Sequence, residues 1–164
     1  MNQRNNSFRV LRKLHFSMLV GLFGFTIISF FIMKKGFILA AGESFNRIFQ
    51  VIAILVSLST LILGFNIFKK KIVAIRSATV SAENRMRQYQ TACIMWWVMI
   101  EVPGILAGIG YILTGNLSFL FLAILHILLL FIFMPRKDNI IVLLNFNSKE
   151  VRELEGESRI AQGT

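Results

Sequence analysis

The sequence predicts an all-α integral membrane protein whose four transmembrane helices form two antiparallel hairpins, followed by a short cytoplasmic C-terminal helix. Two observations carry this prediction. Of the 164 residues, 55% are hydrophobic, and they gather in long runs that a soluble domain of this length does not contain. The 18 Lys and Arg residues lie between these runs and towards the chain ends. A membrane barrel would instead show short segments of alternating hydrophobicity.

Four apolar segments are long enough to cross a bilayer. They comprise residues 15–33, 48–68, 91–113 and 117–134. A helix rises about 1.5 Å per residue, so roughly 20 apolar residues cover a hydrocarbon core about 30 Å thick. The predicted four-span domain therefore covers residues 1–135. The first segment is longer than the apolar region of a usual signal peptide, so we expect a retained helix, with cleavage as the alternative.

The distribution of basic residues predicts the orientation. Fifteen of them lie before the first segment, in the linker at 69–90 or after the fourth segment, and three lie in the other two loops. The positive-inside rule then places both termini and the linker in the cytoplasm of a multi-pass protein, in a plasma membrane or bacterial inner membrane. These cations would lie against anionic lipid heads. Topology thus explains the net charge of +10, and no nucleic-acid-reading motif favours DNA or RNA as a partner.

The connecting segments complete the predicted organisation. The loop at 114–116 is so short that the third and fourth spans must be antiparallel neighbours. The linker at 69–90 contains neither Gly nor Pro, so we expect it to extend the flanking helices, with a turn near 77–81. Ser81 is suited to cap the helix that follows this turn. The alternative is a solvated basic loop.

The tail at 136–164 is predicted to be a juxtamembrane segment. Pro135 ends the fourth span. Asn147 and Glu150 have the spacing of a capping box, and Gly156 suits a helix end, which predicts a helix at 148–155. The segment at 140–144 is too apolar to lie free in water. We expect it in the membrane interface, against the linker, or covered by a partner.

Glu101 is the main functional candidate. A charged group at the bilayer centre costs about 2.5–3.5 kcal/mol on insertion scales, and such residues usually face a helix bundle or a wet cavity. Gly104 and Gly108 share its helix face and form a GxxxG pattern that permits close helix approach. Pro103 removes a backbone hydrogen bond and predicts a kink. Because burial disfavours the charged form, we expect a neutral Glu101.

His126 is the second proton or ion candidate. Counted from the 114–116 turn, Glu101 and His126 are about one helical turn out of step, so a direct contact is allowed and not required. A lone His among leucines is more often a hydrogen-bonded packing residue than a ligand. Further hydroxyls at similar depth belong to Thr26, Ser29, Ser57, Ser59 and Thr60. These groups would suffice for a proton relay, but they offer too few ligands for a metal site.

Two functions remain open for this chain. The first is a non-enzymatic structural or regulatory subunit that assembles with itself or with other membrane subunits, its Glu–Gly face serving as a docking seam. The alternative is an oligomeric transport or proton- or cation-handling protein that uses Glu101. An enzyme is disfavoured, because no CxxC, HExxH, P-loop or GxSxG motif occurs, and no cofactor is expected. The single Cys93 excludes an internal disulfide.

Overall fold

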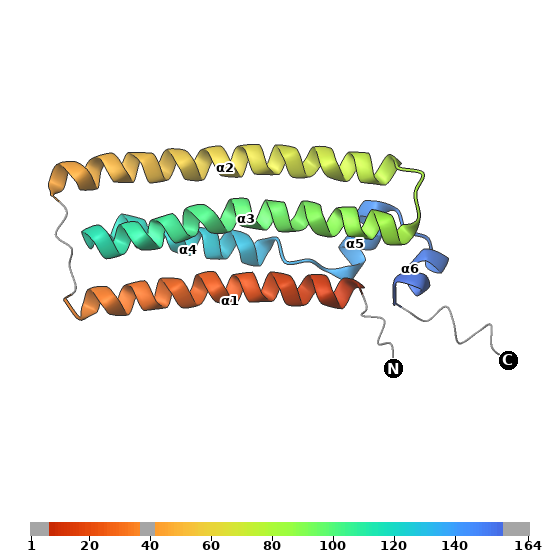
Figure 1. The fold of residues 1–164 in the computed structure, drawn as a ribbon, viewed down its shortest axis with the longest axis horizontal. Helices are drawn as coiled ribbons and strands as arrows, with labels where there is room; N and C mark the ends of the chain where they lie inside the picture. Colours follow the sequence, from red (N-terminus) through yellow and green to blue (C-terminus); the bar gives the residue numbers. More distant parts are fainter. Residues whose placement is uncertain (1–6, 37–41, 156–164) are drawn as a thin grey trace.

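The structure, a computed structural model, describes residues 7–36 and 42–155, and every regular element in these two ranges is a helix (Figure 1). The prediction of an all-α fold is confirmed for this part of the chain. The helices are α1 (Ser7–Lys34), α2 (Glu43–Ser77), α3 (Ala82–Thr114), α4 (Leu117–Ile132), α5 (Lys137–Leu144) and α6 (Ser148–Glu155).

Three of these helices, α1, α2 and α3, are long and apolar enough to cross a membrane. The chain therefore has the helices of a membrane protein. The fourth apolar segment behaves differently. α4 has 16 residues, which is about 24 Å, and it reaches the length and apolarity of a span only together with α5, from which it is bent by 70°.

α4 ends at Ile132, two residues before the predicted end of the fourth span. Pro135 explains this difference. It has no N–H to donate to the carbonyl of Phe131, and its ring disfavours helical geometry at Met134. The amide of Met134 turns instead to the Phe131 carbonyl, at 3.3 Å. The chain then leaves the axis of α4 and starts α5 at Lys137.

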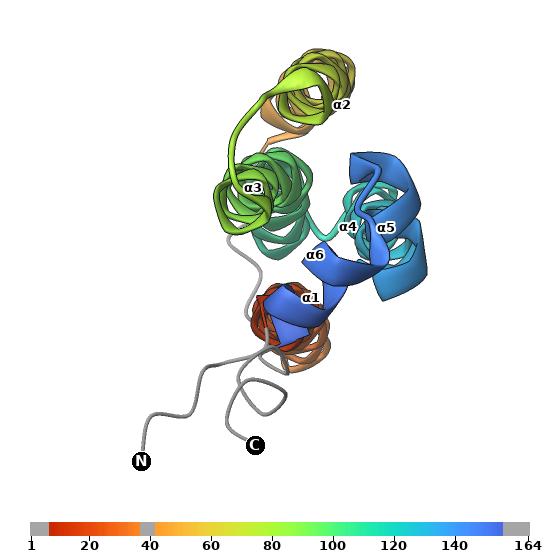
Figure 2. The same ribbon diagram turned by 90° about the vertical axis from the view of Figure 1, so that its right-hand side faces the viewer.

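α3 is the central helix of the bundle. Viewed along the helices, it lies between α1 and α2, with α4 beside it (Figure 2). Half of its most apolar stretch is buried, against 17% for the corresponding stretches of α1 and α2. Thus α1 and α2 are consecutive in the chain but are separated in space by α3. α3 and α4 are packed neighbours, as their short connection requires.

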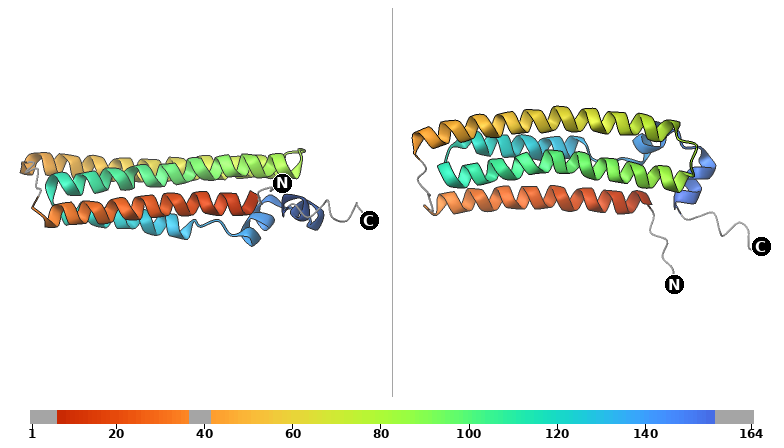
Figure 3. Two further views of the ribbon diagram at one scale, coloured as in Figure 1. Left: turned by 60° about the horizontal axis from the view of Figure 1, so that its bottom comes forward. Right: turned by 45° about the horizontal axis from the view of Figure 1, so that its top comes forward.

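One end of the bundle gathers the shorter elements of the chain. The start of α1, the passage from α2 to α3, and helices α5 and α6 share this end (Figures 1 and 3). The predicted turn in the linker lies at 78–81, between the two helices. As expected, the side chain of Ser81 caps α3 by accepting a hydrogen bond from the amide of Asn84, at 3.4 Å.

The tail packs on the bundle and buries apolar residues of α5 and α6 there. α6 covers the predicted range, and Asn147 and Glu150 form the expected capping box: Oδ1 of Asn147 accepts from the amide of Glu150 at 2.9 Å, and Oε2 of Glu150 accepts from the amide of Asn147 at 2.9 Å. Ile140 and Leu144 of α5 are buried. Gly156 and the rest of the tail lie outside the described residues.

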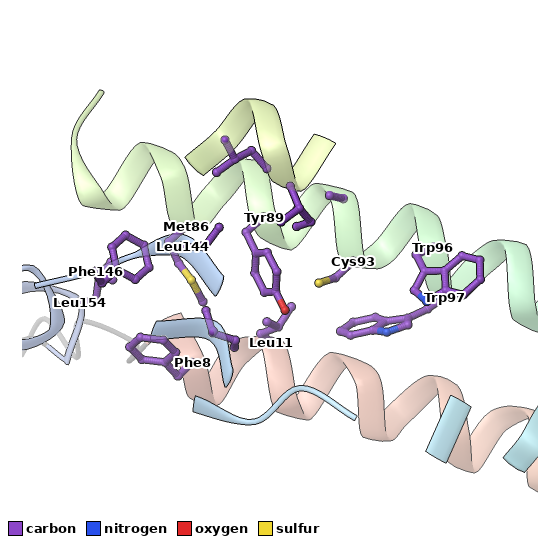
Figure 4. Packing of buried hydrophobic residues seen from close by; sticks show 14 of the residues in the cluster. Phe8, Leu11, Met86, Tyr89, Cys93, Trp96, Trp97, Leu144, Phe146 and Leu154 are labelled. Atoms are coloured by element: carbon purple, nitrogen blue, oxygen red, sulfur yellow. The ribbon is translucent and has the colours of Figure 1, made fainter. Parts of the chain in front are cut away.

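The buried cluster at this end joins the tail to the bundle. Figure 4 shows side chains of α1, α3 and the tail meeting there, among them Phe8, Leu11, Met86, Tyr89, Leu144, Phe146 and Leu154. Of the three alternatives for residues 140–144, the structure shows the packing against the linker segment. Burial of this apolar surface holds α5 and α6 on the bundle.

Candidate functional site

Glu101 lies half-buried on the side of α3 that faces α1. Its carboxyl approaches Gly21 of α1: a Cβ atom built on that glycine would lie 3.8 Å from Oε1 of Glu101. The next residue of α3, Val102, is 52% exposed, so Glu101 lies at the border between the packed seam and the outer surface. Among residues 7–36 and 42–155, no hydrogen bond or ion pair holds its carboxyl.

Gly104 and Gly108 form a seam that the chain itself fills. A Cβ atom added to Gly104 would lie 3.0 Å from Cδ2 of Leu22 and 3.0 Å from Cβ of His126. One added to Gly108 would lie 2.6 Å from Cε1 of Phe25. Both glycines therefore contact α1, and Gly104 also contacts α4. The hypothesis that this glycine face docks onto a partner needs correction, because its space is occupied within the chain.

These contacts also fix the direction in which α1 runs. Gly21, Leu22 and Phe25 of α1 meet Glu101, Gly104 and Gly108 of α3 in the same order. The two helices are therefore parallel neighbours, and Gly21 of α1 lies at the level of Glu101 of α3.

Pro103 is fully buried and lies inside α3, which continues as one helix on both sides of it. The neighbouring Met99 points at α2, where a Cβ atom on Gly64 would lie 2.6 Å from its sulfur. Around Pro103, α3 therefore packs closely against α2 at Gly64, and against α1 and α4 at its own Gly104.

His126 is a buried cross-link between α4 and α2. Its Nδ1 lies 2.8 Å from the carbonyl of Leu122, and its Nε2 lies 3.0 Å from Oγ of Ser57. A carbonyl only accepts, so Nδ1 carries the proton and, in the neutral ring, the hydroxyl of Ser57 donates to Nε2. Both nitrogens are occupied, and the contact with Glu101 that the spacing allowed is not made.

The other hydroxyls do not connect the two candidates. Thr26 donates to the carbonyl of Leu22 and Ser29 to that of Phe25, each at 2.9 Å. Thr60 likewise bonds within its own helix, and Ser59 is exposed. Such bonding to the preceding turn is usual for Ser and Thr in helices. Within the described residues, no group of three His, Cys, Asp or Glu side chains is placed to hold a metal ion.

His15 has a structural role that the sequence analysis did not predict. Its Nε2 donates to the carbonyl of Leu130 at 2.9 Å, and its ring lies edge-on to Trp97, with 4.7 Å between centroids. The last carbonyls of a helix lack intrahelical donors, and α4 ends just beyond Leu130. The signal was available: Pro135 predicts an abrupt helix end, and His15 lies at the same end of the bundle.

Arg85 is the second residue whose role the sequence did not reveal. It was counted as a basic residue of the linker, yet it is buried. Its Nη1 donates to the carbonyl of Leu144 at 3.0 Å, its Nη2 pairs with Glu150, and its guanidinium lies 4.7 Å from the ring centroid of Phe146. Arg85 therefore fastens the end of α5 and the start of α6 to α3.

No protein-family model, curated protein or solved structure matches this chain. The geometry around Glu101 thus carries the functional argument. It consists of one carboxyl at the edge of a close-packed seam, without a partner in the described ranges, next to an exposed glycine of α1.

Proposed function

We propose that this protein is a non-enzymatic membrane subunit of structural or regulatory type, which assembles with a further membrane helix along the α1–α3 face that carries Glu101. The further helix belongs to a second copy or to another subunit. The observation that carries this proposal is the half-buried carboxyl of Glu101, which has no hydrogen-bond partner in the described part of the chain.

A polar group at this depth calls for a partner. Placing a carboxyl in the apolar layer costs about 2.5–3.5 kcal/mol on insertion scales when it is charged, and such residues pair with other polar groups or face a bundle interior. The side chains of His126, Ser57, Thr26 and Ser29 are already engaged elsewhere. A donor from a second helix would satisfy Glu101 without rearranging the bundle.

The surface of α1 beside Glu101 favours the close approach of such a helix. Ser17, Gly21 and Gly24 lie on one face of α1, four and three residues apart. Ser17 and Gly21 are exposed, and a Cβ atom on Gly24 would have no atom within 4 Å. Small residues at this spacing allow two membrane helices to bring their backbones together.

The membrane topology that accompanies this proposal has four spans with both termini in the cytoplasm. α4, with α5 bent away at its end, is the fourth crossing. In its support, the basic segments at the start of α1, between α2 and α3 and after α4 lie at one end of the bundle. A plasma membrane or bacterial inner membrane, with anionic lipid heads at that end, fits this charge distribution.

The second candidate function is proton or cation handling by Glu101 in an oligomer. One observation favours it: the carboxyl is partly exposed and has no fixed partner in the described ranges. Against it, the remaining polar groups of the membrane layer form local bonds and provide no continuous path from Glu101 to His126.

A pair of serine variants tests the assembly proposal. Ser17→Leu places a bulky side chain on the proposed face, and Ser59→Leu makes the same change at an exposed position of α2. We expect Ser17→Leu to lower the mass of the complex purified in mild detergent, measured by light scattering, and Ser59→Leu to leave it unchanged. If both variants keep the parent mass, the α1–α3 face is not an assembly surface.

A further inference from the structure

The break between α4 and α5 opens a groove on another side of the bundle, away from α1. It has a volume of about 480 Å³ and lies between α2, α3 and the α4–α5 bend. This volume falls in the range of about 300–1,000 Å³ typical of small-molecule sites. The groove lies where the chain turns away from the axis of α4 at Pro135, which is itself a lining residue.

The walls of the groove are aromatic and fixed. Trp96 of α3 is stacked against Phe68 of α2, with 6.3 Å between ring centroids, and lies edge-on to Phe133 at 5.2 Å. All three residues line the groove. Rings held in this way offer a large apolar surface that loses little conformational freedom when it is covered.

Trp96 also carries an unpaired donor. Its side chain is almost completely buried, and its Nε1 has no hydrogen-bond partner among the described residues. A buried N–H without an acceptor is unfavourable, because it has lost its hydrogen bond to water. Because this N–H is enclosed, the groove offers an occupant the apolar surface of the ring and no hydrogen bond from Trp96.

One basic residue lines the groove. Arg136 lines it, is exposed, and has no ion pair within the described ranges. Phe68, on the opposite wall, is followed directly by Lys69, Lys70 and Lys71. The groove therefore lies where apolar segments give way to cations, which is the depth at which a phospholipid passes from acyl chain to phosphate.

We propose that this groove binds one anionic phospholipid of the leaflet on the basic side of the protein. Its acyl chain lies along Phe68, Trp96 and Phe133, and its phosphate meets Arg136. This binding is independent of the assembly proposed above, which uses α1 and Glu101.

Tryptophan fluorescence gives a direct test, because the chain has two Trp residues and both line the groove. The full chain is reconstituted in phosphatidylcholine vesicles that contain increasing amounts of either phosphatidylglycerol or phosphatidylcholine brominated on an acyl chain. We expect half-maximal quenching at a several-fold lower mole fraction of the brominated phosphatidylglycerol. Arg136→Gln should reduce this preference about fivefold, the contribution of one basic residue at an anionic surface.

Arg12→Gln is the matched control, since Arg12 is exposed on α1, outside the groove, and it should keep the preference of the parent. Unchanged helical circular dichroism shows that each variant is folded. Three results would overturn the proposal: equal quenching by the two lipids, a preference that survives Arg136→Gln, or no quenching by either lipid. The last result would mean that a protein segment closes the groove.

Discussion

His126 shows how a single buried polar side chain is accommodated in this bundle. Its two ring nitrogens are satisfied by one carbonyl of its own helix and by the hydroxyl of Ser57 on α2. The ring is completely buried, and hydrogen bonding removes the cost of placing its polar atoms there. Its ring is thus packed and hydrogen-bonded beside Gly104.

The bond between Ser57 and His126 should have a measurable coupling energy. In a double-mutant cycle with Ser57→Ala and His126→Phe, we expect about 0.6 kcal/mol, the average found for hydrogen bonds between membrane helices, and at most about 1.7 kcal/mol. The cycle is obtained from reversible unfolding in mixed detergent micelles. Ser59→Ala, at an exposed site on the same helix, should show no coupling with His126→Phe, and equal values for the two serines would contradict this role of Ser57.

Residues that bond to distant carbonyls were the part of the site that sequence reasoning could not supply. His15 binds the carbonyl of Leu130, and Arg85 binds that of Leu144. The residue type does not reveal which backbone carbonyl lacks a donor. Only a predicted helix end indicates that its last carbonyls need one. Glu101 and His126 were found because ionisable groups are rare in apolar segments, but their separation depends on how α1, α3 and α4 pack.

At the scale of the elements, local signals predicted helix starts well and one helix end poorly. Ser81 and the capping box at Asn147 mark the starts of α3 and α6 through bonds between near neighbours in the chain. Pro135 indicates that α4 ends, but it does not fix the last helical residue. A long-range contact also acts there, because His15 donates to the carbonyl of Leu130. The bend that Pro135 starts is held by burial of Ile140 and Leu144 against the bundle, a long-range effect.

The seam between α1 and α3 should be sensitive to single methyl groups. A Cβ atom on Gly108 would lie 2.6 Å from Phe25, whereas one on Gly24 would meet no atom within 4 Å. Overpacking of this kind costs about 1–3 kcal/mol, so Gly108→Ala should lower the free energy of unfolding by that amount. Gly24→Ala is the matched control, and it should be neutral or slightly stabilising, since alanine favours the helix.

Unfolding in mixed micelles measures both glycine variants on one scale. If Gly108→Ala and Gly24→Ala have the same stability, α1 is not in close contact with α3 in the folded protein, and the placement of Glu101 beside Gly21 is wrong as well.

At the scale of the whole molecule, composition and charge indicated the class of protein, while the arrangement of helices needed the structure. The apolar runs predicted helices of spanning length, and three are present. Nothing in the pattern indicated that α3 lies between α1 and α2 (Figure 2). That arrangement follows from side-chain fit, in which the glycines of α2 and α3 admit large neighbours such as Trp96 and Leu22.

Reporter fusions test the proposed topology. Fusions after Lys71 and after Arg136 should report the cytoplasm, and one at Gly42 should report the opposite side, because the basic residues concentrate at one end of the bundle. An outside signal after Lys71 would overturn the orientation. A fusion after Arg136 that reports the outside would show that α4 does not cross the membrane.

The protonation state of Glu101 tests the central claim, that this carboxyl serves assembly and not ion handling. Infrared difference spectra of the complex are recorded between about pH 5 and 9, and the band that disappears in Glu101→Gln identifies the group. A carboxyl held by a partner helix in an apolar seam stays protonated throughout, and the Gln variant assembles as the parent does, because it preserves volume and hydrogen bonding. A band that titrates within this window, with an assembled but inactive Gln variant, would contradict the account and favour proton or cation handling.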